Sequence, residues 1–128
     1  MTYGANQYKR TAVKTATPGQ ILIMLYEAAI RHLRRAVACI EANDLNGKGV
    51  AIGKSHDILN ELNNSLNFEV GGEVAKQLEG LYNYCIGQLL KANVENQKEP
   101  LISVIKVMEN LLEGWRGAVE QVNKGVSK

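Results

Sequence analysis

Apolar side chains recur along this 128-residue chain at intervals of three and four residues. That spacing is typical of helices that bury one face, and no segment shows the sustained alternation of a half-buried strand. The pattern predicts four helices, over residues 17–42, 50–68 and 73–93 and from Pro100 to about 122. The second helix could begin a few residues before 50, where glycines interrupt the pattern. The expected inward residues of the first three helices are Leu22, Leu25, Ala29, Leu33, Ala36 and Ile40; Ala51, Ile58, Leu59, Leu62 and Leu66; and Val74, Leu78, Leu81, Cys85, Leu89 and Ala92.

The segments between the expected helices are short and rich in turn-forming residues. Residues 43–49 combine Asn, Asp and Gly, and Gly71-Gly72 is expected to end the second helix. Short connections place successive helices antiparallel. The sequence therefore predicts an all-α fold, an antiparallel up-down-up-down four-helix bundle over residues 17–128. Residues 1–16 are polar apart from Tyr3, Tyr8 and Val13, and we expect them to form a mobile N-terminal arm.

The start of the first helix carries a complete set of capping signals. Thr17 suits the N-cap position, Pro18 suits the first helical position, and Gln20 can complete a capping box. An unbroken apolar run, residues 21–25, then follows. This run is wider than a single buried stripe, so the first helix is expected to have a second apolar face.

Composition excludes several classes of protein. Apolar residues make up 45% of the chain, which is enough for one globular core, and the net charge of +2 is too small for a dedicated nucleic-acid binder. No signal-peptide core is present, and no apolar run approaches the roughly 20 residues that span a bilayer. Cys39 and Cys85 do not form a disulfide framework, and free thiols in a reducing cytoplasm are expected.

Candidate catalytic and cofactor sites are weak. His32 or His56 on a four-helix bundle could belong to a histidine phosphotransfer protein, although a polar neighbour of the core explains His32 as well. No spacing of His, Cys or Glu supports a metal site, and the contiguous Ser55-His56-Asp57 cannot form a triad on a helix. We expect no enzyme activity, no cofactor and no metal. The Arg31, Arg34 and Arg35 cluster fits either an anionic surface or a solvated helix face.

Three tyrosines, Tyr26, Tyr82 and Tyr84, lie within the expected helices beside leucines. A tyrosine offers apolar area together with a hydroxyl group, so it suits the edge of a partner-binding groove. It also suits the rim of a bundle core, and the residues alone leave both interpretations open. Further apolar side chains lie beyond the expected stripes; these are Ile21, Ile23, Met24, Ile52, Ile86, Leu90 and Val107.

A set of short motifs extends over almost the whole chain in a fixed order. The set comprises Tyr8-Lys9, Thr15-Ala16-Thr17-Pro18, Leu25-Tyr26-Glu27, Ile58-Leu59-Asn60-Glu61-Leu62, Ser65-Leu66, Gly71-Gly72-Glu73-Val74-Ala75, Leu78, Leu81-Tyr82-Asn83-Tyr84, Leu90-Lys91-Ala92-Asn93 and Trp115. No single motif is specific, but together they resemble the flagellar secretion chaperones, a family that binds flagellin in the cytoplasm.

The resemblance implies a cytoplasmic, non-enzymatic export chaperone. Its partner would be the C-terminal region of unassembled flagellin, bound in apolar grooves between helices so that premature polymerisation is prevented and delivery to the export apparatus is supported. Export-gate components are a further candidate partner, and a helical adaptor for another client is the other alternative. The resemblance also implies that the N-terminal arm covers part of the groove when the partner is absent. The expected partner-binding residues are Tyr8, Ile21, Met24, Leu25, Tyr26, Leu62, Leu66, Leu81, Tyr82 and Leu90.

Overall fold

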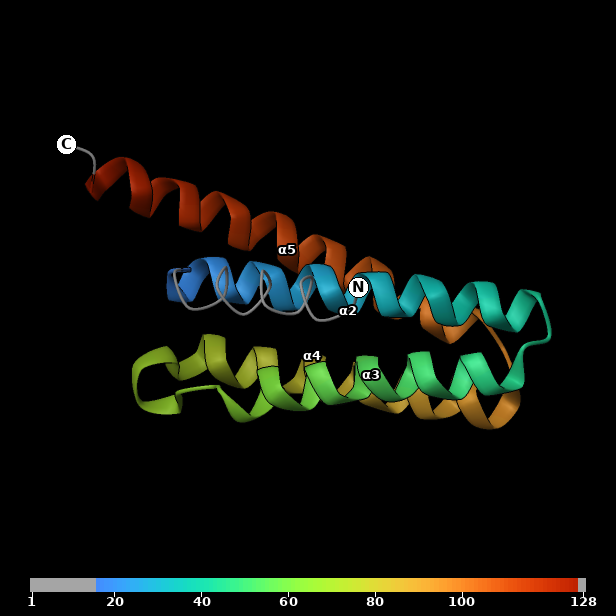
Figure 1. Ribbon diagram of the computed structural model, residues 1–128. Helices are drawn as coiled ribbons and strands as arrows, with labels where there is room; N and C mark the ends of the chain where they lie inside the picture. The colour runs from blue at the N-terminus through green and yellow to red at the C-terminus, as the bar shows by residue number, and fades with distance from the viewer. Residues whose placement is uncertain (1–15, 127–128) are drawn as a thin grey trace.

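A computed structural model describes residues 16–126, which form four α-helices (Figure 1). The helices are α2 (Pro18–Glu41), α3 (Leu45–Asn64), α4 (Phe68–Glu95) and α5 (Glu99–Val126). Successive helices run antiparallel, α2 packs on α3 and α5, and α4 packs on the same two helices. The predicted up-down-up-down bundle is therefore confirmed. Residues 1–15 of the predicted arm lie outside the described residues.

The N-terminus of α2 has the predicted capping box. The backbone N–H of Gln20 donates to Thr17 Oγ1 at 3.2 Å, and the backbone N–H of Thr17 donates to Gln20 Oε1 at 2.9 Å. Pro18 occupies the first turn, where no intrahelical N–H bond is required. These bonds satisfy N–H groups that the helix itself cannot pair, so α2 begins at the predicted position.

Helix α3 begins five residues before the predicted start at 50, because the glycines that suggested a turn are helical. Asp44 is the N-cap, and its carboxylate accepts a hydrogen bond from the backbone N–H of Gly47 at 2.9 Å. A Cβ at Gly47 would lie only 2.8 Å from Cys39 Sγ and 2.4 Å from an Asp44 carboxylate oxygen. Gly47 therefore serves close packing of α3 against α2, and assigning it to a turn was wrong.

The end of α3 and the start of α4 also differ from the prediction. Helix α3 ends at Asn64, and Asn67 caps a first turn of α4 that precedes Gly72. Gly72 is the break, with φ 52° and ψ −123°, a conformation that residues with a Cβ rarely adopt. The sequence thus located the break correctly, but it assigned Phe68 to the preceding helix and left residues 69–71 between helices.

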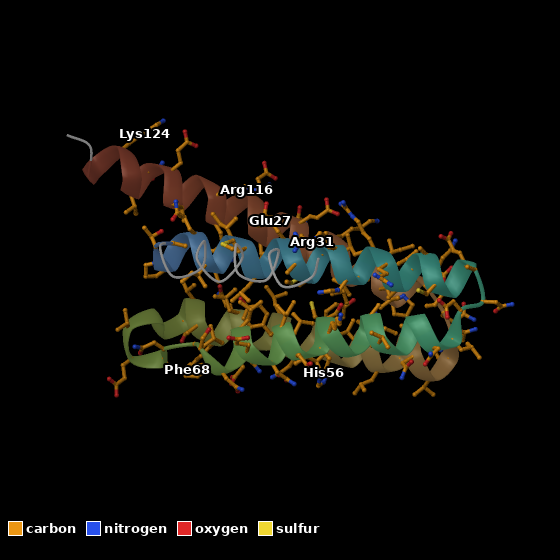
Figure 2. All side chains as sticks on the ribbon, in the orientation of Figure 1. Glu27, Arg31, His56, Phe68, Arg116 and Lys124 are labelled. Atoms are coloured by element: carbon orange, nitrogen blue, oxygen red, sulfur yellow. The ribbon has the colours of Figure 1, made fainter. Side chains whose placement is uncertain are left out.

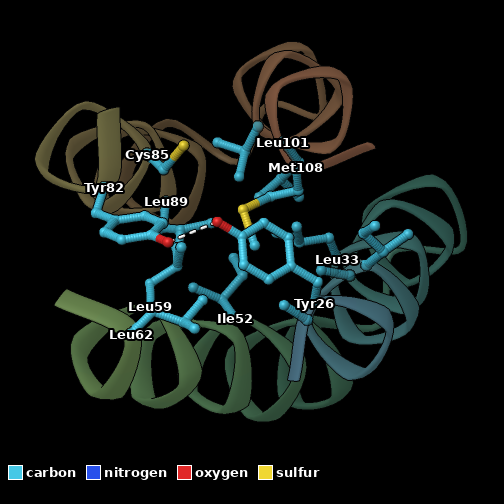
Figure 3. Packing of buried hydrophobic residues seen from close by; sticks show 14 of the residues in the cluster. Tyr26, Leu33, Ile52, Leu59, Leu62, Tyr82, Cys85, Leu89, Leu101 and Met108 are labelled. Carbon is cyan, nitrogen blue, oxygen red and sulfur yellow. Dashed lines mark hydrogen bonds between the residues drawn. The ribbon is translucent and has the colours of Figure 1, made fainter. Parts of the chain in front are cut away.

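The core is a continuous apolar cluster with contributions from all four helices (Figure 3). Leu33, Leu59, Leu89, Leu101 and Met108 are fully buried at its centre. Three expectations about this core were wrong. Ile52 is buried rather than surplus, while Val74 and Leu81 are 59% and 36% exposed rather than inward. At these two turns of α4 the next residue, Ala75 or Tyr82, is buried instead, while the other predicted inward residues of α4 are buried as expected.

Lys48 is the one buried charged side chain of the described bundle. Its Nζ donates to the backbone carbonyl of Asn93 at 3.2 Å and to Asn96 Oδ1 at 3.1 Å. Both acceptors lie at the C-terminus of α4, where Asn96 adopts a left-handed conformation, φ 53°. A cation at this end pairs with carbonyl groups that the helix leaves free and with the negative end of its dipole. Lys48 therefore joins α3 to the end of α4.

Candidate apolar groove

Helix α5 diverges from α4 as it runs towards its C-terminus (Figure 1), while Arg116 and Val119 in this half still contact α2. Two contacts hold it there. A Cβ on Gly19 would lie 2.8 Å from Val119 Cγ2, so the two backbones approach closely, and Arg116 forms an ion pair with Glu27 at 2.8 Å (Figure 2). On the α4 side, α5 presents the small residues Gly114 and Ala118. Small side chains cannot fill the widening space, so a hollow remains between α4 and α5.

This hollow is a pocket of about 320 Å³, here named the side pocket. Its walls come from the N-terminal half of α4 and the middle of α5. Its lining residues are Val74, Gln77, Leu78, Leu81, Asn110, Leu111, Gly114, Trp115 and Ala118. None of them carries a charge, and its leucine and tryptophan side chains make the side pocket predominantly apolar.

A second pocket of about 290 Å³, the end pocket, lies at the same end of the bundle. It is formed where α2 and α4 begin and α3 ends. Its lining residues are Leu22, Leu62, Ser65, Leu66, Asn67, Val70, Gly71, Val74, Ala75, Leu78, Tyr82 and Trp115. Again no charged residue contributes. Val74, Leu78 and Trp115 line both pockets, so the two adjoin along these residues and are here together named the apolar groove.

Tyr26 and Tyr82 meet in the core (Figure 3), and Tyr82 also lines the end pocket. Their hydroxyl oxygens are 2.5 Å apart, and their exposed fractions are 0% and 2%. The Tyr26 ring also meets Trp115 edge to face, with 6.5 Å between centroids. Burial raises the pKa of both phenols, and burial raises the pKa of the neighbouring Cys85 thiol to about 11. These groups therefore stay neutral at physiological pH.

The two open interpretations of the tyrosines are now separated by position. Tyr26 and Tyr82 belong to the core. Tyr26 is fully buried and its ring meets Trp115 edge to face, so it does not lie at an exposed groove edge in the free protein, and its role in binding stays a prediction. Tyr82 contributes to the floor of the end pocket. Tyr84 is 48% exposed, and its hydroxyl forms a 2.8 Å hydrogen bond with Ser103.

The other expected binding residues are distributed over several surfaces. Leu62 and Leu66 line the end pocket and Leu81 lines the side pocket, so the structure brings these three together with Tyr82. Ile21, Met24 and Leu25 on α2 and the 56% exposed Leu90 on α4 line neither pocket. Tyr8 lies outside the described residues. Their roles in binding stay predictions.

Several groove residues were expected only as core. Leu22, Val74 and Leu78 carry the correct periodicity for a buried stripe, and nothing in that periodicity separates a packed position from a groove wall. One signal was available. Gly114 and Ala118 flank Trp115 on the α4-facing side of α5, and two small residues one turn apart leave room beside a helix.

A larger cavity of about 550 Å³ lies between α2 and α5, but its chemistry is different. Arg31, Arg34 and Arg116 alternate there with glutamates above a floor of Ile30 and Leu112. Arg34 pairs with Glu109 at 3.1 Å, so this part of the basic cluster is partly neutralised. An apolar partner would have to strip water from these charges at a cost that the apolar groove does not impose.

The histidines do not form a catalytic site with neighbouring groups. His32 is half-buried, and its pKa is lowered by burial and by the cations of Lys54, Arg31 and Arg35. His56 Nδ1 lies 3.1 Å from the side-chain nitrogen of Asn60, one turn along α3. No group of three metal-ligating side chains occurs within residues 16–126. None of the helices in the described part is long and apolar enough to cross a membrane.

Comparison with known proteins decides the family. Residues 1–122 match the family described as flagellar protein FliS. The chain belongs to the FliS family. A flagellar secretion chaperone FliS from Campylobacter jejuni is 37% identical over 111 residues, which cover 87% of each protein. FliS from Bacillus subtilis is 30% identical over 117 residues, 91% of this chain and 86% of that protein.

Further FliS relatives and a solved structure agree. FliS from Salmonella typhimurium is 37% identical over 107 residues, 83% of this chain and 79% of that protein. A crystal structure of a bacterial flagellar chaperone superposes with a TM-score of 0.77, covering 92% of this chain and 98% of the other at 23% identity, and it supports the fold. The chain is therefore a flagellar secretion chaperone of the FliS family, and the family is non-enzymatic, as the resemblance predicted.

Proposed function

We propose that this chaperone binds the C-terminal region of unassembled flagellin in the apolar groove. Binding takes place in the cytoplasm, prevents premature polymerisation and holds the client for delivery to the flagellar export apparatus. The observation that carries the proposal is the uncharged lining shared by the side pocket and the end pocket, in a chain of the FliS family. Its shared residues, Val74, Leu78 and Trp115, form a surface that favours an apolar, uncharged stretch of polypeptide.

The physical logic favours a helix-in-groove contact. A segment that is unfolded before binding loses conformational entropy when it docks, so it needs a large apolar surface to reach useful affinity. A groove between two helices offers that surface to the apolar face of an amphipathic helix. Val74 and Leu81 are already exposed in the free protein, at 59% and 36%. Covering them on binding removes apolar area from water at little cost to the bundle.

Isothermal titration calorimetry with a flagellin C-terminal segment tests the proposal. We expect Leu81→Asp to weaken binding at least tenfold, because it would bury a carboxylate without a partner in the side pocket. Val50→Asp is the matched control. Val50 is 54% exposed on α3 and lines neither pocket, so the same charge there should leave the affinity within about twofold.

The outcomes separate the alternatives. Equal effects of the two variants, or no effect of either, contradict the groove assignment. No binding of the flagellin segment by the wild-type chain contradicts the client, and it would favour a helical adaptor with another partner. Weaker binding after substitution of Leu90 or Met24 would show that the client also contacts the surfaces around those residues. Export-gate components remain a candidate second partner, which the same titration can address with the chaperone–client complex.

A further inference from the structure

The wall of the end pocket includes a short turn at the junction of α3 and α4. This turn, residues 66–72 and here named the rim turn, links the end of α3 to the continuous part of α4. Asn67 Oδ1 accepts hydrogen bonds from the backbone N–H groups of Glu69 and Val70, both at 3.1 Å. Gly71 N–H donates to the backbone oxygen of Asn67 at 2.8 Å. These three bonds lie within the turn itself.

Gly72 separates the rim turn from the rest of α4. Its φ of 52° and ψ of −123° interrupt the helix, and an added Cβ at this position would meet open space. A glycine in this conformation is free to change φ and ψ without a steric barrier from its neighbours. On the other side, Leu66 is packed against the core and anchors the turn. The rim turn therefore has a fixed end at Leu66 and a pliable end at Gly72.

The rim turn exposes large apolar side chains beside an apolar pocket. Val70 is 85% exposed and Phe68 is 44% exposed, and Figure 2 shows Phe68 at the end of the bundle where α3 and α4 meet. Val70 and Gly71 line the end pocket together with Val74. Exposed apolar groups that border a pocket are typical of an interaction surface, because leaving them in water is unfavourable.

From these observations we infer that the rim turn is a hinged wall of the binding groove, which closes Val70 and Phe68 over the client segment seated in the end pocket. The inference rests on the proposed function and extends its surface beyond the rigid helices. The occupant is the apolar face of the flagellin segment rather than a charged ligand, since no charged residue lines the end pocket. The surface is also continuous with the side pocket through Val74, Leu78 and Trp115.

Two nearly identical valines on α4 provide a matched test. Val70 is 85% exposed and lines the end pocket, whereas Val94 is 83% exposed and lines neither pocket. In calorimetric titration with the flagellin C-terminal segment, we expect Val70→Ser to weaken binding about five- to tenfold, the effect of losing one or two buried methyl groups. Val94→Ser should leave the affinity unchanged, and both variants should keep the wild-type urea midpoint because both side chains face water in the free protein.

The results distinguish this inference from the proposed function. If Val70→Ser and Val94→Ser both bind as the wild type does while Leu81→Asp is impaired, the proposed function stands and the hinged wall is overturned. Equal weakening by both serine variants also overturns the hinged wall, because the loss of affinity would then come from lost apolar surface in general and not from the rim turn. If the wild-type chain itself fails to bind the segment, the proposed function and the inference fall together.

Amide hydrogen exchange tests the hinge separately. In the free protein, the amides of residues 68–71 should exchange faster than those of residues 75–85, because the break at Gly72 separates them from the continuous part of α4. Saturation with the flagellin segment should slow exchange in the rim turn at least tenfold, and Val70→Ser should reduce that slowing. Exchange in residues 68–71 that is unchanged by a bound client overturns closure of the rim turn.

Discussion

The hydroxyl oxygens of Tyr26 and Tyr82 lie 2.5 Å apart at the centre of the bundle, where they join α2 to α4. Each ring is buried, so water cannot replace the hydrogen bond between the two hydroxyls. This contact links the two helices whose first turns border the apolar groove.

The hydrogen bond between the two tyrosine hydroxyls should contribute to stability, and a double-mutant cycle can measure it. Tyr26→Phe or Tyr82→Phe alone should lower the free energy of unfolding by about 1–3 kcal/mol, because each strands a buried hydroxyl. The double variant removes both hydroxyls, so it should lose less than the sum of the single changes. Urea melts of the four proteins measure this coupling. Strict additivity would show that the pair does not interact.

Helix α4 shows how much of the fold could be predicted from the sequence. Helical periodicity predicted the helix and its approximate buried face, because burial of one face is what produces that periodicity. It placed Val74 and Leu81 inward, although they border the groove, since a helix in contact with a hollow has the same pattern as one in contact with a neighbour. Helix divergence depends on how Gly19 meets Val119 across the fold, which is not a local property.

The glycines show the same limit. Gly47 looked like part of a turn, but its contact with Cys39 arises only once α3 packs on α2. Gly72 looked like a break and is one, because its backbone conformation is local. Local signals, including the Thr17 cap, were predicted correctly, whereas the groove was formed by tertiary packing that no single segment encodes.

Glycine substitutions test this distinction directly. Gly53 lies inside α3 with open space around its Cβ position, so Gly53→Ala should raise the free energy of unfolding by about 0.5–1 kcal/mol through helix propensity. Gly47→Ala should lower it, because the new Cβ would crowd Cys39 and Asp44. Thermal and urea melts of the two variants should move in opposite directions. A stabilised Gly47→Ala protein would contradict the close packing of α2 on α3.

The buried cation of Lys48 should contribute more to the free energy of unfolding than an exposed lysine does. Lys48→Met removes its bonds to Asn93 and Asn96 and leaves the end of α4 without a cation, which should cost about 1–3 kcal/mol of the free energy of unfolding. Lys106→Met, at an exposed position on α5, is the control and should change it by less than about 0.5 kcal/mol. Similar effects of the two substitutions in urea melts would show that Lys48 does not stabilise the end of α4.

Alkaline pH should destabilise the bundle. Burial raises the pKa of Cys85 to about 11, and burial also raises the pKa of Tyr26 and Tyr82. Above about pH 9 the unfolded chain releases these protons while the folded chain retains them, so the free energy of unfolding falls as pH rises. The Cys85 contribution should be on the order of 1–2 kcal/mol between pH 9 and 11. Urea melts should show a shallower decline for Cys85→Ala, and an identical decline would contradict the assignment.

The N-terminal arm provides a kinetic prediction. If the arm, residues 1–16 with Tyr8, competes with the client for the groove, its effective concentration on a short tether is about millimolar, and only the uncovered fraction binds. Deleting it should speed association with the flagellin segment in stopped-flow mixing and increase dimer or aggregate on a sizing column. Unchanged association together with an unchanged monomer peak would show that the arm does not cover the groove.

The most direct test of the central claim uses Trp115, the only tryptophan in the chain and a residue that lines both pockets. A tryptophan-free flagellin C-terminal segment is titrated into the chaperone while the emission of Trp115 is recorded. Occupation of the apolar groove predicts a saturable blue shift with the same dissociation constant as calorimetry, and Leu81→Asp should weaken both signals together. Calorimetric binding of the segment with no change in Trp115 emission would contradict the account, because the client would then bind somewhere other than the groove.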